Sequence, residues 1–90
     1  MREARVRIIN QLGLHARAAA QLVKLAGTFK SRILIVREDK NVFADAKSIL
    51  SVLTLAASLG TELSLQVDGD DSAEALAALI QLFERGFGEI

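Results

Sequence analysis

The sequence predicts an α+β fold: an open-faced β-sandwich whose four-stranded, mainly antiparallel sheet carries three helices on one face. Two segments, 3–9 and 62–68, alternate apolar and polar residues, which is typical of strands with one buried and one solvated face. Two other segments, 16–26 and the stretch after residue 71, repeat apolar residues at helical spacing. The resulting order, β-α-β-β-α-β-α, favours a sheet with its helices gathered on one side.

The first half of the chain predicts a strand, a helix and a hairpin. Ala4, Val6 and Ile8 alternate with charged residues until Gly13, which can adopt positive φ, breaks the pattern. An Ala-, Leu- and Lys-rich helix follows, and Gly27 stands where its C-cap is expected. A β-branched run then predicts a central strand, which a polar turn joins to its neighbour. The expected elements are strands over 3–9, 32–37 and 42–46, and a helix over 16–26.

The second half predicts a short helix, a strand and a long final helix. Ser48 is placed as the N-cap of the short helix over 49–55, and Gly60 closes that segment. The alternation in 62–68 predicts a strand. Asp70 or Asp71 caps the last helix, with a glutamate three residues after Asp71 as a near capping box. The apolar stripe of that helix consists of Leu76, Leu79, Ile80, Phe83 and Phe87.

Composition restricts the chemistry of the chain. Its 90 residues are 51% hydrophobic, which allows one domain, residues 1–90, with a real core. Because the chain has no cysteine and one histidine, disulfide scaffolds, thiol catalysis and His- or Cys-rich metal cages are disfavoured, and we expect no metal and no cofactor. No apolar run approaches the roughly 18 residues of a membrane span, and no signal-peptide pattern opens the chain. We therefore expect a small cytoplasmic protein without membrane insertion.

Charge argues against nucleic-acid binding. The formal net charge is zero, and four phenylalanines without tyrosine or tryptophan offer little for base stacking. The distribution is uneven: ten basic and four acidic groups give residues 1–47 a net +6, whereas one basic and seven acidic groups give residues 48–90 a net −6. This asymmetry produces a dipolar surface unless the halves interleave in space, and the sequence leaves both arrangements open.

The segment 12–17 (LGLHAR) carries the most chemistry. His15 stands between a glycine-containing loop and the start of a predicted helix, where free backbone N–H groups and the positive end of the helix dipole surround its ring. Both disfavour the imidazolium form, so a neutral, nucleophilic imidazole is expected near neutral pH. The same N–H groups bind anions, and Arg17 adds a charge-assisted hydrogen bond. A neutral nucleophile, a helix N-terminus and a guanidinium together suit reversible phosphoryl transfer.

The order of elements and two motifs resemble the HPr family, the histidine-containing phosphocarriers of the bacterial phosphoenolpyruvate:carbohydrate phosphotransferase system. The motifs are GLHAR at 13–17 and AKSI at 46–49, at the relative spacing of the family. The resemblance covers essentially the whole chain.

The resemblance implies a carrier with a transient phosphohistidine and not an enzyme. His15 matches the histidine that accepts a phosphoryl group on Nδ1 from phosphorylated enzyme I and passes it to a IIA component, and Arg17 matches the active-site arginine. Ser48 matches a serine that an HPr kinase/phosphorylase modifies in some bacteria. A monomer is expected. Positions that dock partners beside the histidine are matched by Leu14, Ile49, Leu50 and Leu53.

One position departs from the family pattern His-x-Arg-Pro, because Ala18 stands in the place of the proline. Proline is tolerated in a first helical turn, where the N–H has no partner within the helix, and alanine is an excellent helix former. The helix is therefore expected to form without the proline. We expect altered rates of phosphoryl transfer, not their loss.

Several alternatives remain open. The run over 74–80 and the motifs that follow it are closer to NPr, the nitrogen-branch paralogue, whereas the motif around Ser48 is closer to the sugar branch. A regulatory module would dock partners through the same patch without carrying phosphate. An acylphosphatase-like hydrolase needs an anion-binding arginine and a water-orienting asparagine; Asn10 and Arg17 are present, but in no motif of that class.

Overall fold

The computed structural model describes residues 1–89. Its elements follow the order predicted from the sequence, and two short 3-10 turns, η1 and η2, are added. In chain order they are β1 (Arg2–Arg7), α1 (Ala16–Ala26), β2 (Arg32–Arg37), η1 (Glu38–Lys40), β3 (Val42–Asp45), α2 (Ile49–Leu53), β4 (Glu62–Asp68), α3 (Ser72–Glu84) and η2 (Gly86–Gly88).

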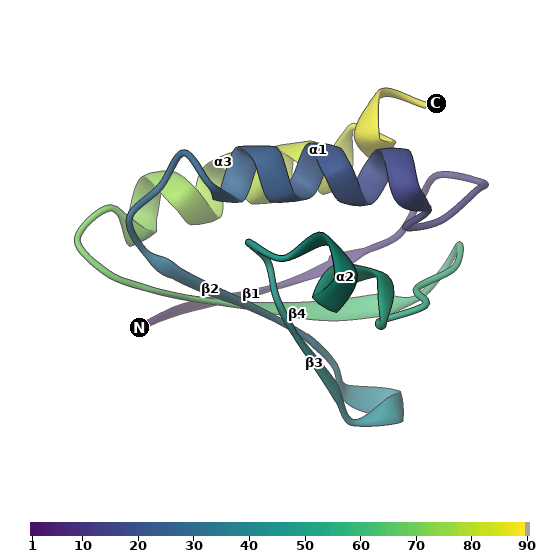
Figure 1. Ribbon diagram of the computed structural model, residues 1–90, viewed down its shortest axis with the longest axis horizontal. Coiled ribbons are helices and arrows are strands. Elements are labelled where there is room, and N and C mark those ends of the chain that lie inside the picture. Colours follow the sequence, from purple (N-terminus) through teal and green to yellow (C-terminus); the bar gives the residue numbers. More distant parts are fainter. Residues whose placement is uncertain (90) are drawn as a thin grey trace.

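The four strands form one sheet in the order β1-β4-β2-β3, and all three neighbouring pairs are antiparallel. Helices α1 and α3 lie side by side over one face, with α2 on the same side above β3 (Figure 1). The predicted open-faced α+β sandwich and the predicted hairpin of β2 and β3 are confirmed. The position of β4 between β1 and β2 was not predicted, because alternation reveals which face a strand buries and not which strand lies beside it.

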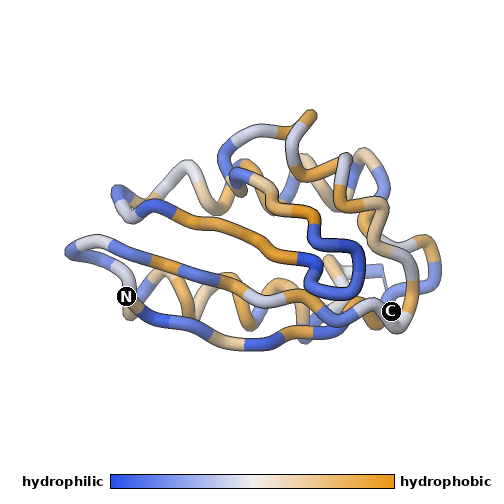
Figure 2. Tube along the Cα trace, turned by 90° about the horizontal axis from the view of Figure 1, so that it is seen from below, coloured by the Kyte–Doolittle hydropathy of each residue, from blue (hydrophilic) through white to orange (hydrophobic). Residues whose placement is uncertain are grey.

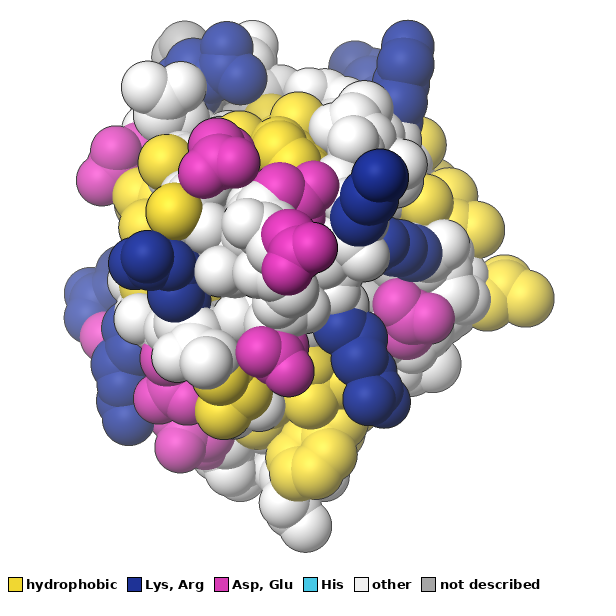
Figure 3. Space-filling model, turned by 90° about the vertical axis from the view of Figure 1, so that its left-hand side faces the viewer, with side chains coloured by type: hydrophobic (Ala, Val, Ile, Leu, Met, Phe, Trp, Pro, Cys, Tyr) yellow, Lys and Arg dark blue, Asp and Glu magenta, His cyan; other side chains and the backbone are white. Residues whose placement is uncertain are grey.

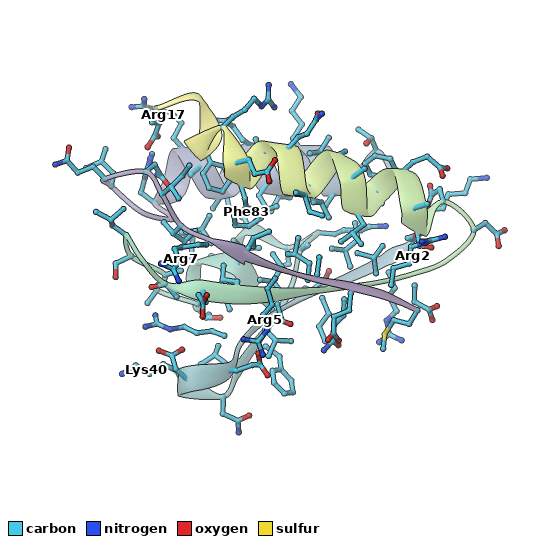
Figure 4. All side chains as sticks on the ribbon, turned by 180° about the vertical axis from the view of Figure 1, so that it is seen from behind. Arg2, Arg5, Arg7, Arg17, Lys40 and Phe83 are labelled. Carbon is cyan, nitrogen blue, oxygen red and sulfur yellow. The ribbon has the colours of Figure 1, made fainter. Side chains whose placement is uncertain are left out.

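The core lies between the sheet and the helices. Inward residues of β1, β2 and β4 are buried, while their neighbours in sequence face the opposite side, as the alternation predicts. Figure 2 shows this open face of the sheet from below, with the apolar run of β2 across it. Phe83 points from α3 toward the sheet (Figure 4), and its ring meets Phe87 edge-to-face at a centroid distance of 5.1 Å. This pair fixes the end of α3 on the sheet.

Several elements end earlier than the sequence predicts. The strands predicted over 3–9 and 42–46 end at residues 7 and 45. Helix α2 ends at Leu53, and the chain then turns through Ala56, whose φ of +48° is incompatible with continued right-handed helix. Likewise, Gly86 has φ +57° and ends α3 after Glu84, so Phe87 belongs to η2 and not to the helix.

The predicted cap of α3 is wrong in its chemistry. Asp71 occupies the N-cap position, but its side chain makes no capping hydrogen bond. Its carboxylate instead accepts hydrogen bonds from the Lys30 N–H (2.8 Å), the Ser31 N–H (2.9 Å) and the Ser31 hydroxyl (2.5 Å). Asp71 therefore ties the connection after α1 to the connection before α3. The hydrogen bond from Ser31, and then that from Lys30, hold the pKa of Asp71 below its usual range.

Asp71→Asn is expected to lower stability at neutral pH, because an amide replaces one of the two acceptor oxygens with a donor. A carboxyl with a depressed pKa in the folded state stabilises above its unfolded pKa, and this contribution is lost as the pH falls through the folded value. The difference in free energy of unfolding between the two chains should therefore shrink below about pH 4. Urea melts from pH 7 to pH 2.5 measure it. Asp70→Asn, at the exposed neighbouring position, is the control, and an equal, pH-independent loss in both variants would contradict this role of Asp71.

The basic and acidic halves of the sequence interleave in space. The basic strand β1 lies against β4 of the acidic half, with Arg7 paired to Glu62 at 3.0 Å. Figure 3 shows acidic and basic side chains interspersed on the face that carries the α1–β2 and β4–α3 connections. The dipolar arrangement is therefore disfavoured. Among residues 1–89, no helix has the length and apolar character to cross a bilayer.

Candidate functional site

His15 is the N-cap of α1. Its backbone is extended (φ −75°, ψ 178°), and its carbonyl accepts the first hydrogen bond of the helix, from the Ala19 N–H at 2.8 Å. The preceding loop is held against the segment after α2, because the Leu14 N–H donates to the Ala57 carbonyl at 2.8 Å. Gly13 approaches the same segment so closely that a Cβ there would lie 2.6 Å from the Ala57 oxygen. A glycine is thus required to bring His15 to this place.

Both ring nitrogens of His15 have a partner. Nδ1 accepts a hydrogen bond from the Arg17 backbone N–H at 3.3 Å, and Nε2 contacts Oε2 of Glu89. A neutral ring that carries its proton on Nε2 satisfies both contacts, because Nδ1 then offers a lone pair and Nε2 donates to the carboxylate. The side chain of His15 is 24% exposed. In this arrangement the lone pair of the neutral ring is on Nδ1, at the N-terminal end of α1.

Glu89 was missed by sequence reasoning. Asn10 holds it in place by donating from Nδ2 to Glu89 Oε1 at 2.8 Å and also to the Gly13 carbonyl at 2.8 Å. That hydrogen bond from Asn10, and then the contact with His15 and the charge of Arg17, keep the pKa of Glu89 below its usual range, so the group is a carboxylate at neutral pH. Glu89 and His15 are 74 positions apart, and no local spacing indicates their contact. The N-terminus of α1 is therefore not the only charge beside His15, because the carboxylate of Glu89 contacts its ring.

Arg17 lies in the first turn of α1 with an exposed side chain, near the C-terminal turn of the chain (Figure 4). Ala18, the position that departs from the family pattern, is fully buried within the same turn. The helix forms without the proline, as expected. The N-terminus of α1 places partial positive charge beside Nδ1 of His15, and the charge of Arg17 acts on Glu89, which contacts Nε2. Within residues 1–89 there is no cluster of three His, Cys, Asp or Glu side chains suited to a metal.

A second part of the site is α2, which packs beside α1. Ser48 is its N-cap, with Oγ accepting from the Ser51 N–H at 3.3 Å, as predicted. Ile49 and Leu50 are 39% and 75% exposed. Leu53, in contrast, packs partly against the core, and Leu14 is 5% exposed and belongs to the core. The apolar surface at α2 is therefore formed by Ile49 and Leu50, whereas Leu14 and Leu53 belong to the core or pack against it.

Known proteins share the sequence pattern and the fold of this chain. The family model described as "PTS HPr component phosphorylation site" matches residues 2–85. Phosphocarrier protein HPr of Cupriavidus necator is 50% identical over 82 residues, which cover 91% of this chain and 90% of that protein. HPr-C-His of Thermoanaerobacter tengcongensis has a TM-score of 0.93 at 41% identity, covering 100% of this chain and 99% of that one.

An HPr dimer from the same organism is also similar, with a TM-score of 0.77 at 42% identity over 99% of this chain and all of that one. The expected monomeric state therefore stays a prediction. The match of the family model over nearly the whole chain, the identity to curated relatives and the fold lead to one conclusion: the chain belongs to the HPr family of phosphocarrier proteins of the phosphotransferase system.

Proposed function

We propose that the chain accepts a phosphoryl group from phosphorylated enzyme I on Nδ1 of His15 and passes it to a IIA component. The observation that carries this proposal is the environment of the ring: the Nδ1 lone pair lies at the N-terminus of α1, while Nε2 is held against Glu89. No resident metal or cofactor takes part. The whole chain, residues 1–90, acts as one cytoplasmic carrier domain.

The transfer step needs little beyond positioning and charge. The hydrogen bond from the Arg17 N–H to Nδ1 breaks, and the Nδ1 lone pair attacks phosphorus. The bond between phosphorus and the donor breaks, and its electron pair leaves with the donor. The proton stays on Nε2. The N-terminus of α1 and the Arg17 guanidinium then stabilise the negative phosphoryl oxygens. Transfer to the acceptor reverses these steps and returns His15 to its neutral form.

Arg17→Ala is expected to slow phosphoryl transfer by about 10- to 100-fold, because one charge-assisted contact to the phosphoryl group is lost. Stability should hardly change, since the side chain is exposed. Stopped-flow phosphorylation by enzyme I measures the rate. Lys24→Ala is the control, because it removes an exposed positive charge from the same helix further from His15. An equal loss of rate in both variants would show that Arg17 acts only through the net charge of the chain and not through a contact with the phosphoryl group.

Delivery to a IIA component separates a carrier from a module that only docks. The chain would be phosphorylated with phosphoenolpyruvate and enzyme I, freed of both, and mixed with IIA proteins of the sugar branch or the nitrogen branch. A carrier loses its phosphoryl group while one IIA protein gains it. The IIA protein that is phosphorylated faster assigns the branch. Binding without transfer to either would favour the regulatory module.

We further propose that Ser48 is a regulatory phosphorylation site, addressed by an HPr kinase/phosphorylase, and that Ile49 and Leu50 dock partners. A phosphate at the N-terminus of α2 is locally favourable, but it places up to two negative charges beside this apolar surface. Ser48 is only partly exposed, and its Oγ caps α2. In the phosphorylated chain a phosphate oxygen would have to replace the hydroxyl oxygen as the cap of α2.

Ser48→Asp is expected to weaken binding of enzyme I or a IIA protein by at least about tenfold, because a charge enters a docking surface that is otherwise apolar. Ser48→Asn keeps a good N-cap without charge and serves as the control. Isothermal titration calorimetry measures the dissociation constants. Equal binding by the two variants would count against this regulatory role.

A further inference from the structure

The carboxylate of Glu89 makes no contact with the phosphoryl group in the transfer step described above, yet a buried side chain, that of Asn10, holds it in place. Asn10 is fully buried, and both amide hydrogens are used: one holds the Gly13 carbonyl of the loop before His15, and the other holds Glu89 Oε1. The amide oxygen of Asn10 has no hydrogen-bond partner among the described residues. A buried polar group with an unsatisfied oxygen costs stability, which argues that the two donated hydrogen bonds serve a purpose.

The two oxygens of Glu89 are divided between two donors. Oε1 accepts from Asn10, and Oε2 faces Nε2 of His15. The side chain is 16% exposed, so water competes poorly for either oxygen. Because the carboxylate has no proton to donate, Nε2 must supply one, and the neutral ring is then left with its lone pair on Nδ1. Free imidazole in water has no such constraint.

We propose that Glu89, held by Asn10, is a positioning residue that fixes the Nε2–H tautomer of His15 and so presents Nδ1 for phosphoryl transfer. The carboxylate has a second consequence in the same step. When Nδ1 bonds to phosphorus while Nε2 keeps its proton, the ring becomes positively charged, and a carboxylate against Nε2 stabilises that charge. This inference rests on the proposed carrier function of His15.

Glu89→Gln tests the proposal, because the amide has one acceptor oxygen where two are needed. If that oxygen keeps the hydrogen bond from Asn10, the amide NH₂ faces His15 and favours a ring with its proton on Nδ1. The share of the Nε2–H tautomer should fall from dominant to minor, seen as an exchange of the two ¹⁵N chemical shifts of the neutral ring. Phosphorylation by enzyme I should slow by about tenfold or more.

Glu84→Gln is the matched control, since it removes the same charge from an exposed position at the end of α3. It should change neither the ¹⁵N spectrum nor the rate. Asn10→Asp supplies a second test: it places a carboxylate against Oε1 of Glu89, so the two acids repel at neutral pH and the tautomer should shift in the same direction. Thermal melts of each variant verify that the fold persists.

The tautomer measurement needs no partner protein, so the two proposals fail in different ways. If the unaltered chain receives no phosphoryl group from active enzyme I, the carrier function fails and the inference falls with it. If the unaltered chain is phosphorylated and Glu89→Gln matches it in ¹⁵N shifts, or shifts its tautomer without any loss of rate, the inference alone is overturned.

Discussion

His15→Ala abolishes phosphoryl acceptance and leaves the chain folded: this is the largest functional effect that we expect. The methyl group has no lone pair, so no bond to phosphorus forms, and the signal should fall to background in an assay with enzyme I. The loss of stability should be about 1 kcal/mol, because Nδ1 of His15 accepts one N-cap hydrogen bond, from the Arg17 N–H, and the residue is not part of the core.

His15→Asn distinguishes chemistry from folding. Asparagine is among the best N-cap residues, so this variant should match the stability of the unaltered chain while remaining inert to phosphorylation. Chemical denaturation and intact mass measured on both variants give the two quantities. If either variant gained an acid-labile phosphoryl group, the modified residue would not be His15. If His15→Ala were unfolded, the residue would be structural.

Gly13→Ala is expected to cause the largest loss of stability among the single-residue changes around the site. Gly13 has φ +68°, and a Cβ would lie 2.6 Å from the Ala57 oxygen and 2.9 Å from Cα of Ser58, both backbone atoms that cannot rotate away. Left-handed strain and overpacking together should cost about 2–4 kcal/mol. For a chain of this size that lowers Tm by at least about 10 °C.

The same change should disturb the site, because the Gly13 carbonyl is one of the two partners of Asn10. Slower phosphorylation of the folded variant is therefore expected beside the lower Tm. Gly60→Ala is the matched control: φ is +89° there, but nothing lies within 4 Å of an added Cβ. Its loss should be only about 1 kcal/mol, from backbone strain. Equal losses of stability in the two variants would show that the close approach of Gly13 to the Ala57 segment does not add to the cost of the substitution.

The sequence predicts the elements whose residue pattern extends along their whole length. The bounds of α1, β2 and β4 agree with the sequence, because helical spacing, a β-branched run and strict alternation each extend over a whole element. The bounds of α2 were less predictable, since its end depends on Ala56 in a left-handed conformation. Nothing in an alanine predicts that conformation; Arg37 supports it by donating to the carbonyls of Leu55 and Ala56 at 2.9 Å.

Long-range contacts explain what the sequence did not predict at the site. His15 and Arg17 were identified because a glycine loop before a helix is a local signal. Glu89 follows η2 at the far end of α3 and meets His15 through tertiary packing, and Asn10 joins Glu89 to the Gly13 carbonyl of the loop before His15. Leu14 matched a docking position by family pattern, yet tertiary packing buries it to 5% exposure. The spacing of residues along the sequence reveals neither such long-range contacts nor the burial of a single side chain by tertiary packing.

Intact mass spectrometry shows whether His15 carries a phosphoryl group. The chain is incubated with phosphoenolpyruvate and enzyme I from a related bacterium, and its mass is measured before and after mild acid. We expect a gain of one phosphoryl group that acid removes and that His15→Ala does not show. No gain with sugar-branch or nitrogen-branch enzyme I, each active on its own partner, would mean that His15 is not a phosphoryl carrier and would favour a regulatory module.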